Sequence, residues 1–226
     1  MNFSARNKKV AFKRWERTLA REREHINNSL EGLHKKSILC GFLAGDGSVQ
    51  IRKDRNFLHY ETKFFPDDKL MLQTYLNAMR FVYGKTPSIR KRDNVYHARL
   101  TSRTVVEDLL RYATFGIGGW CLPLELFAVP NSKEAWLRAF FSAEAYVGSN
   151  QIKVQTINKR GMDEVSKLLN ELGIDHRRYE YIPKNEKWSP VSMIFINKKA
   201  ARKSFYKKIG FYHSRKTDAL KKSLGL

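Results

Sequence analysis

The stretch GFLAGDGSVQIRK, residues 41–53, joins an apolar, helix-like run to a basic alternating segment through small residues and one acid. Gly41 and Gly45 are four residues apart, so they lie on one face of a helix, where another backbone can approach closely. Asp46 follows at the helix end, where the free carbonyl groups already carry partial negative charge. A carboxylate at this place is unfavourable unless a cation lies beside it. The stretch therefore predicts a closely packed helix that ends at a cation site.

The same order of features returns in AFFSAEAYVGSNQIK, residues 139–153. Ala139 and Ala143 form the small pair, and Glu144 is the acid. If the two small faces pack on each other, Asp46 and Glu144 are brought together at the ends of two neighbouring helices. One copy alone would suggest only a close helix contact with a solvated acid. With hard oxygen ligands and no His or Cys nearby, we expect Mg²⁺ (or Mn²⁺) rather than zinc.

The apolar and turn patterns predict two related αββαββα units, an α+β fold. In the first unit we expect helices near 36–46, 67–81 and 102–112, with strands near 47–53, 57–65, 87–92 and 95–101. In the second we expect helices near 133–144, 162–173 and 198–210, with strands near 145–157, 177–182 and 190–196. Gly173 and Gly210 are helix stop signals. The expected divisions are an arm over 1–35, units over 36–113 and 133–226, and a linker over 114–132.

Charge is the strongest global feature, because 43 Lys and Arg against 22 Asp and Glu give a net charge of +21. Such a chain favours a polyanionic partner, and nucleic acid is the expected one. No secretion signal or long apolar run is present, so we expect a cytoplasmic protein, inside a prokaryotic cell or an organelle. Cys40 and Cys121 have no metal-ligand spacing.

The N-terminal region is basic and has a sparse apolar stripe. Phe12, Trp15 and Leu19 recur at spacings of three and four within residues 6–36, which predicts an amphipathic basic helix. We expect this helix to contact the nucleic acid as an accessory arm or to pack on the outside of the body.

Two nine-residue segments, LCGFLAGDG (39–47) and LRAFFSAEA (137–145), resemble the signature of the LAGLIDADG homing endonucleases in their single-chain, two-copy form. In the second copy Ala139 and Ala145 replace the usual glycines, and Glu144 replaces aspartate. The resemblance extends over residues 36–225, where 157–174 resemble the family's second helix and 207–224 its C-terminal turn.

The resemblance implies a saddle of antiparallel sheets across double-stranded DNA with a long specific target site, built by a monomer with internal pseudo-two-fold symmetry. It implies a metal site made by Asp46 and Glu144, with the backbone carbonyls of Gly45 and Ala143. Further catalytic candidates near this centre are Lys153, Asn158 and Lys216.

Polar residues alternate with apolar ones along the expected strands, so one face of each sheet is polar. A two-stranded ribbon fits the major groove, where Arg reads guanine and Gln reads adenine. Any single Arg or Lys could equally contact a phosphate. The predicted DNA-binding residues are Ser48, Gln50, Arg52, His59, Glu61, Lys63, Arg90, Arg92, His97, Arg99, Gln151, Lys153 and Gln155.

These features predict a site-specific double-strand DNA endonuclease that hydrolyses phosphodiester bonds with divalent metal. The alternative is a non-cleaving binder on the same scaffold, either an RNA maturase or a DNA-binding regulator. An intein is not expected, because the last residues, KKSLGL, lack a His-Asn end.

Overall fold

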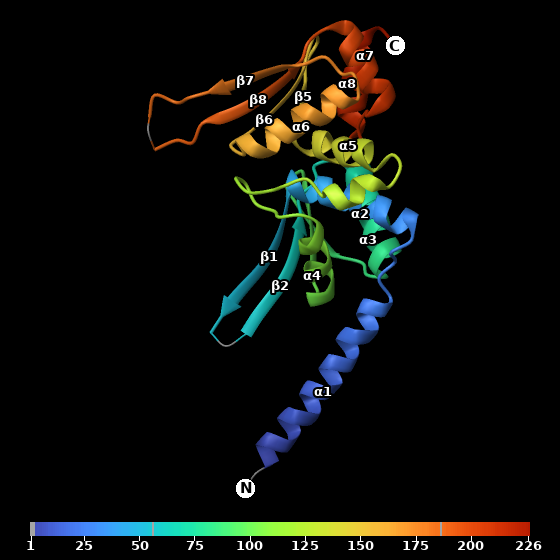
Figure 1. Ribbon diagram of the computed structural model, residues 1–226, viewed down its shortest axis with the longest axis vertical. Helices are drawn as coiled ribbons and strands as arrows, with labels where there is room; N and C mark the ends of the chain where they lie inside the picture. Colours follow the sequence, from blue (N-terminus) through green and yellow to red (C-terminus); the bar gives the residue numbers. More distant parts are fainter. Residues whose placement is uncertain (1–2, 56, 186) are drawn as a thin grey trace.

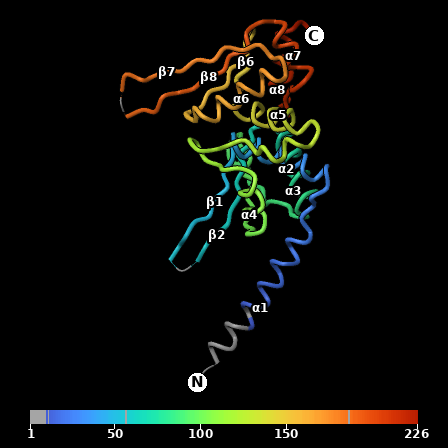
Figure 2. The backbone as a smooth tube through the Cα atoms, viewed as in Figure 1, coloured from blue at the N-terminus to red at the C-terminus, as the bar shows by residue number. Residues whose placement is uncertain are grey.

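The computed structural model describes residues 3–55, 57–185 and 187–226 and consists of two similar units joined along a central pair of helices (Figure 1). Each unit has one four-stranded antiparallel sheet. The backbone trace shows that the two sheets open toward the same side of the molecule, while α1 extends away from the body (Figure 2). The predicted α+β fold with two αββαββα units is confirmed.

The first unit begins with helix α2 and has the strand order β1-β2-β4-β3. Its elements are α2 (Leu30–Ala44), β1 (Gly47–Asp54), β2 (Phe57–Phe64), α3 (Lys69–Tyr83), β3 (Ser88–Arg92), β4 (Val95–Thr101) and α4 (Arg103–Tyr112). A linker with the short 3-10 helix η1 (Leu124–Ala128) leads to the second unit.

The second unit repeats the arrangement with the strand order β5-β6-β8-β7. Its elements are α5 (Ser132–Glu144), β5 (Tyr146–Val147), β6 (Ile152–Thr156), α6 (Lys159–Glu171), β7 (Arg177–Tyr181), β8 (Val191–Ile196), α7 (Lys199–Lys208) and α8 (Ser214–Leu224). Gly173 and Gly210 have left-handed φ angles of 64° and 66° just after α6 and α7, so both predicted stop signals are confirmed.

The small faces of α2 and α5 pack on each other at the centre. A Cβ atom built on Gly41 would lie 2.4 Å from the Trp136 carbonyl oxygen and 2.8 Å from the Ala139 Cβ. One built on Gly45 would lie 2.5 Å from the Ala143 Cβ. No real side chain fits at these distances, so the glycines are what allow the two backbones to meet.

The prediction of one helix over residues 6–36 is wrong. Helix α1 (Phe3–Glu24) ends at Glu24, and a separate helix, α2, begins at Leu30. The start of α2 is six residues earlier than the expected start at residue 36. The break is made by polar residues that compete with helical hydrogen bonds. The Asn27 N–H donates to the Val82 carbonyl at 2.8 Å, and the Ser29 hydroxyl caps α2 by accepting from the Gly32 N–H at 3.1 Å.

The C-terminal half of α1 packs on the body through polar contacts. Glu22 accepts hydrogen bonds from Lys85 at 2.8 Å and Thr104 at 2.6 Å, and Arg23 pairs with Glu107 at 2.9 Å. Leu19 is buried in this contact, whereas Trp15 stays 43% exposed. The apolar stripe therefore contacts the body through Leu19 and through Trp15, whose ring centre lies 5.0 Å from the Arg103 guanidinium of α4.

The C-terminal segment differs from the expected turn, because residues 214–224 form the helix α8. His213 caps this helix through its side chain, and Leu220 and Leu224 are buried. None of the described helices is long and apolar enough to cross a membrane.

Candidate active site and nucleic-acid interface

Asp46 and Glu144 lie where α2 and α5 end side by side. Both carboxyl groups are partly buried, and burial raises the pKa of each. The pKa of Glu144 rises from 4.5 to about 7, because burial and the negative charge of Asp46 both oppose its ionisation. Asp67 adds to the rise in the pKa of Asp46, and Lys216 opposes the rise at both acids. A bound cation would offset the cost of ionising these two neighbouring carboxyl groups, so the pair is a candidate cation site.

Helix α8 brings Lys216 to these acids by docking on the first unit. Ser214 donates to Asp68 through its backbone N–H at 3.2 Å, and Arg215 pairs with Asp67 at 2.8 Å. The Lys216 ammonium then donates to the carbonyl oxygens of Ser142 at 2.6 Å and Ala143 at 2.8 Å. Burial lowers the pKa of Lys216, and the Asp46 carboxylate counteracts this.

A groove of about 790 Å³ lies between the two sheets and contains Glu144 in its wall. Its lining from the first unit includes Gly45, Ser48, Gln50 and Lys63; from the linker Gly116, Ile117 and Trp120; and from the second unit Gln155, Thr156 and Val191. The groove therefore places one acid between residues of both sheets, on the face that the sequence predicted to be polar.

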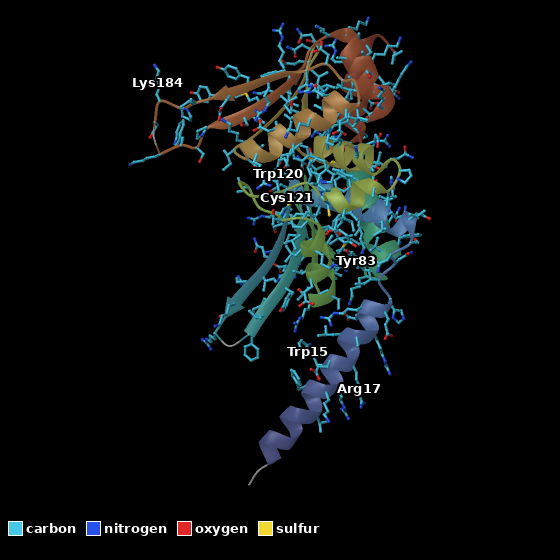
Figure 3. The ribbon with its side chains drawn as sticks, in the orientation of Figure 1. Trp15, Arg17, Tyr83, Trp120, Cys121 and Lys184 are labelled. Carbon is cyan, nitrogen blue, oxygen red and sulfur yellow. The ribbon has the colours of Figure 1, made fainter. Side chains whose placement is uncertain are left out.

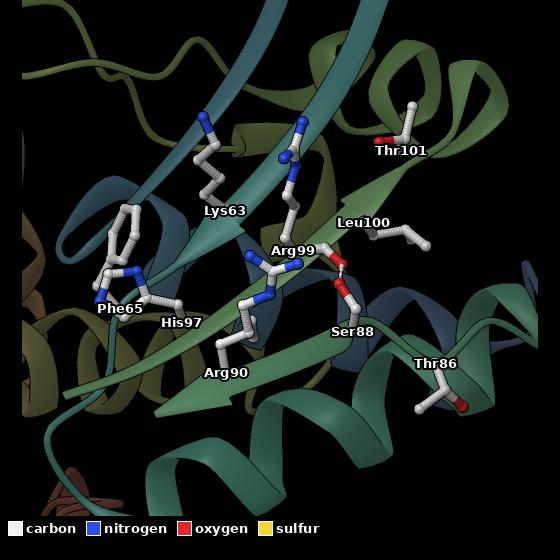
Figure 4. A pocket seen from close by; sticks show the side chains of 10 residues that line it. Lys63, Phe65, Thr86, Ser88, Arg90, His97, Arg99, Leu100 and Thr101 are labelled. Atoms are coloured by element: carbon white, nitrogen blue, oxygen red, sulfur yellow. Dashed lines mark hydrogen bonds between the residues drawn. The ribbon is translucent and has the colours of Figure 1, made fainter. Parts of the chain in front are cut away.

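The exposed face of the first sheet is strongly basic, and a second hollow of about 690 Å³ lies over it. In Figure 4, Lys63, Arg99 and Arg90 rise from the adjacent strands β2, β4 and β3. Glu61 lies on the same face of β2 as Lys63 and pairs with Lys63 at 2.5 Å and with Arg99. Burial alone would raise the pKa of Glu61, but these two cations outweigh it and lower the pKa.

The other predicted DNA-binding residues spread over both sheets. Arg52 and His59 oppose each other near the exposed end of the β1–β2 hairpin, and Arg90 opposes His97. Arg92 ends β3, and Lys153 and Gln155 lie on β6. Gln151 lies outside the strands, one residue before β6, because the pairing of β5 with β6 ends at Val147 and Ile152.

Asn158 caps helix α6 and is not among the residues that line the groove. Its side-chain oxygen accepts from the Gly161 N–H at 3.0 Å and caps α6, which begins at Lys159 rather than at the expected 162. Its amide nitrogen donates to the Trp120 carbonyl at 2.6 Å. Asn158 thus holds the linker against α6, where Trp120 lies between the two units (Figure 3).

Ile117, Trp120 and Asp67 are among the residues near the site that were not selected from the sequence. Ile117 and Trp120 belong to a segment interpreted only as a linker, and Asp67 belongs to the loop before α3. The one available signal for Ile117 was an apolar residue within the glycine-rich stretch 116–119, and in the structure its side chain is 82% exposed. Nothing in the sequence pattern pointed to Asp67. Among the described residues, no three His, Cys, Asp or Glu side chains gather as a metal cluster.

Known proteins are similar to this chain in sequence and in fold. Residues 131–210 match the family model described as a LAGLIDADG-like domain. The fold is similar to that of the homing endonuclease I-DmoI, with 20% identity, a TM-score of 0.62, and coverage of 79% of this chain and 96% of I-DmoI. I-WcaI, solved bound to its DNA recognition sequence, has 16% identity, a TM-score of 0.54, and coverage of 85% of this chain and 86% of its own.

Two curated proteins are similar to this chain in sequence. A DNA polymerase of Thermococcus aggregans is 26% identical over 212 residues, which are 84% of this chain but 11% of the polymerase. The chain thus spans only about a tenth of that relative. An uncharacterized protein of Methanocaldococcus jannaschii is 24% identical over 205 residues, covering 83% of this chain and 70% of that protein.

These findings show that the chain has the LAGLIDADG fold. The chain has this fold in the single-chain, two-motif form of the homing endonucleases, and the resemblance drawn from the two motifs is confirmed.

Proposed function

We propose that this chain is a site-specific endonuclease that binds a long DNA duplex across both sheets and cuts both strands at the central groove. The observation that carries this proposal is the meeting of Asp46 and Glu144 at the ends of two packed helices, next to a groove lined by both sheets. The net charge of +21 supports a polyanionic substrate. I-DmoI, which has the same fold, was solved in complex with DNA and Mn.

The donor set fits a hard divalent cation such as Mg²⁺ or Mn²⁺. Two partly buried carboxylates with raised pKa values lack a full counter-charge, which oxygen-ligated cations supply. The proposed ligands are Asp46, Glu144 and the backbone carbonyls of Gly45 and Ala143. When bound, the cation would neutralise the phosphate charge and activate water for attack. The Ala143 carbonyl oxygen accepts a hydrogen bond from Lys216, so the ammonium group would have to move away before this oxygen binds the cation.

The protein's own residues would hold and orient the scissile phosphates. Lys63 opposes Ser48, the second residue after Asp46, and Lys153 opposes Tyr146, the second residue after Glu144. The two lysines therefore occupy equivalent places relative to the two acids. We propose that each neutralises the phosphate next to one cut, and that Lys216 holds the end of α5 and the two carboxylates in place.

One observation favours the alternative of a non-cleaving nucleic-acid binder. Lys216 already places a positive charge at the Ala143 carbonyl and opposes the rise in pKa of both acids. An ammonium group at this position can neutralise the two acids as a metal ion would, but it does not activate water for attack on a phosphate. The two proposals differ in whether bound duplex is cut.

The experiment is selection followed by cleavage. The purified chain is incubated with a library of long random duplexes in Ca²⁺, bound duplexes are recovered, and these are then incubated with the protein in Mg²⁺ or in EDTA. We expect one defined duplex family to be enriched and to be cut at one position in Mg²⁺ only. Enrichment without cleavage would support the binder. Failure to enrich any duplex would refute the proposal.

A further inference from the structure

The two sheets can be compared position by position, because their strand registers are equivalent. Lys63 and Lys153 oppose the second residue after each acid. On the next strands, Lys63 opposes Arg99 in β4, and Lys153 opposes Phe195 in β8. Arg99 and Phe195 therefore occupy equivalent positions, each on the groove-side face of its own sheet.

Further equivalent pairs follow at intervals of two residues, which keep to the same face of a strand. His97 and its partner Arg90 in the first sheet correspond to Met193 and its partner Tyr179 in the second. Arg92 corresponds to Tyr181, since their partners Val95 and Val191 are also equivalent. Three arginines and one histidine are thus replaced by Phe195, Met193, Tyr179 and Tyr181.

This apolar patch, formed by Phe195, Met193, Tyr179 and Tyr181, is accessible. Tyr179 is 56% exposed and Tyr181 is 44% exposed, and the two other side chains are half-buried. Helix α6 and the core lie on the opposite face, where Ile194 and Ile196 are fully buried. Exposed apolar and aromatic side chains grouped on one face and surrounded by polar residues are typical of an interaction site.

Position and charge favour nucleic acid as the occupant. Val191 and Gln155, which adjoin the patch, line the same central groove as Gln50 and Lys63. The patch is flanked by cations: Lys153 lies 5.7 Å from the Phe195 ring centre, Arg177 opposes Phe195, and Lys184 lies at the end of the β7–β8 hairpin (Figure 3). The apolar patch could contact thymine methyl groups in a major groove, while the cations on either side of it contact the phosphates that border the groove.

We propose that the second sheet reads an A·T-rich half-site through thymine methyl groups, while the first sheet reads its half-site through hydrogen bonds from arginine and histidine. Thymine alone presents a methyl group in the major groove, and apolar side chains recognise it by contact. The target would then be asymmetric in composition. This inference rests on the proposed binding of duplex DNA, but not on cleavage.

The test removes methyl groups without changing base pairing. In the selected duplex, every thymidine of one half-site is replaced by deoxyuridine, then every thymidine of the other, and affinity is measured in Ca²⁺. When the substituted half-site is the one bound by the second sheet, we expect the affinity for the duplex to fall about 4-fold for each methyl group that the patch contacts. The other half-site should respond little.

Variants assign that response to the patch. Phe195→Ala and the exposed Tyr179→Ser should each reduce the preference for thymidine over deoxyuridine in the sensitive half-site. Arg99→Ala, the matched control at the place equivalent to Phe195, should weaken binding and leave that preference unchanged. Tyr179→Ser keeps the test informative if Phe195→Ala does not fold.

Three results would overturn the inference. The two half-sites could respond equally to deoxyuridine, the thymidine preference could persist in both patch variants, or a single-stranded RNA could bind the patch more tightly than the duplex. Each would leave duplex binding itself intact. If no duplex is selected at all, the proposed function fails first and this inference fails with it.

Discussion

The ammonium group of Lys216 donates a 2.8 Å hydrogen bond to the carbonyl oxygen of Ala143, the residue immediately before Glu144. This contact places a positive charge at the end of α5, where the free carbonyls and two acids concentrate negative charge. Lys216 and a divalent cation would therefore compete for the same negative site.

Replacing Lys216 should strengthen cation binding. In Lys216→Met the Ala143 carbonyl is free and the carboxylates lose their internal counter-charge, so Ca²⁺ should bind more tightly. A tenfold gain in affinity would raise the free energy of unfolding by about 1.4 kcal/mol more than in the wild type when Ca²⁺ is saturating. Thermal unfolding at pH 8, with and without Ca²⁺, measures this difference. Lys222→Met, an exposed change on the same helix, should behave like the wild type; an equal Ca²⁺ effect in Lys216→Met would refute the competition.

The glycine face of α2 should tolerate no added methyl group. In Gly41→Ala the new Cβ would meet the Trp136 carbonyl oxygen at 2.4 Å, so the helices must separate. We expect the free energy of unfolding, measured by urea denaturation, to fall by about 1–3 kcal/mol. Gly119→Ala is the matched control, because no atom lies within 4 Å of a Cβ built there. Equal stability of the two variants would show that the helix packing is looser than described.

The raised pKa of Glu144 gives stability a defined pH dependence. In EDTA the folded state binds this proton more tightly than the unfolded state, since burial and Asp46 raise the pKa from 4.5 to about 7. The contribution is fully present below pH 4.5 and is lost as the pH rises through about 7. Glu144→Gln removes this pH dependence, so at pH 8 it should be more stable than the wild type by about 1–3 kcal/mol. Urea denaturation at pH 5 and pH 8 measures this, and an equal difference at both pH values would contradict the assignment.

Much of the fold followed from the sequence because two short motifs repeat. The small residues of α2 and α5 and the acid after each run predicted the central helix pair and the position of Asp46 and Glu144. The break between α1 and α2 was missed, because the local cap at Ser29 was not recognised and the Asn27 N–H bonds to Val82 in another helix. The docking of α8 was also missed, since Asp67 and Asp68 lie far from Ser214 and Arg215 in the sequence. The contact of Asn158 with Trp120 could not be predicted either, because Trp120 comes from the linker.

The basic arm should contribute to binding without directing the cut. Residues 1–14 carry five basic and no acidic residues and precede the segment in which Leu19, Glu22 and Arg23 pack on the body. Deleting 1–14 should weaken duplex binding and reduce its salt dependence by about 0.9 in log–log slope for each phosphate that the arm neutralises in the wild type. The cut position should stay the same. Failure of the truncated chain to fold, seen by circular dichroism, would instead show that this segment belongs to the core.

The central claim is that Asp46 and Glu144 together hold the metal that cuts DNA. The most direct measurement is Mg²⁺-dependent cleavage of the selected duplex by the wild type, Asp46→Asn, Glu144→Gln and the double variant, with binding measured in parallel in Ca²⁺. The two amides keep the shape of the acids and remove the ligand charge, so we predict retained duplex binding and the loss of double-strand cleavage in every variant, with slow nicking at most. A double variant that cuts both strands at the wild-type rate would contradict the account.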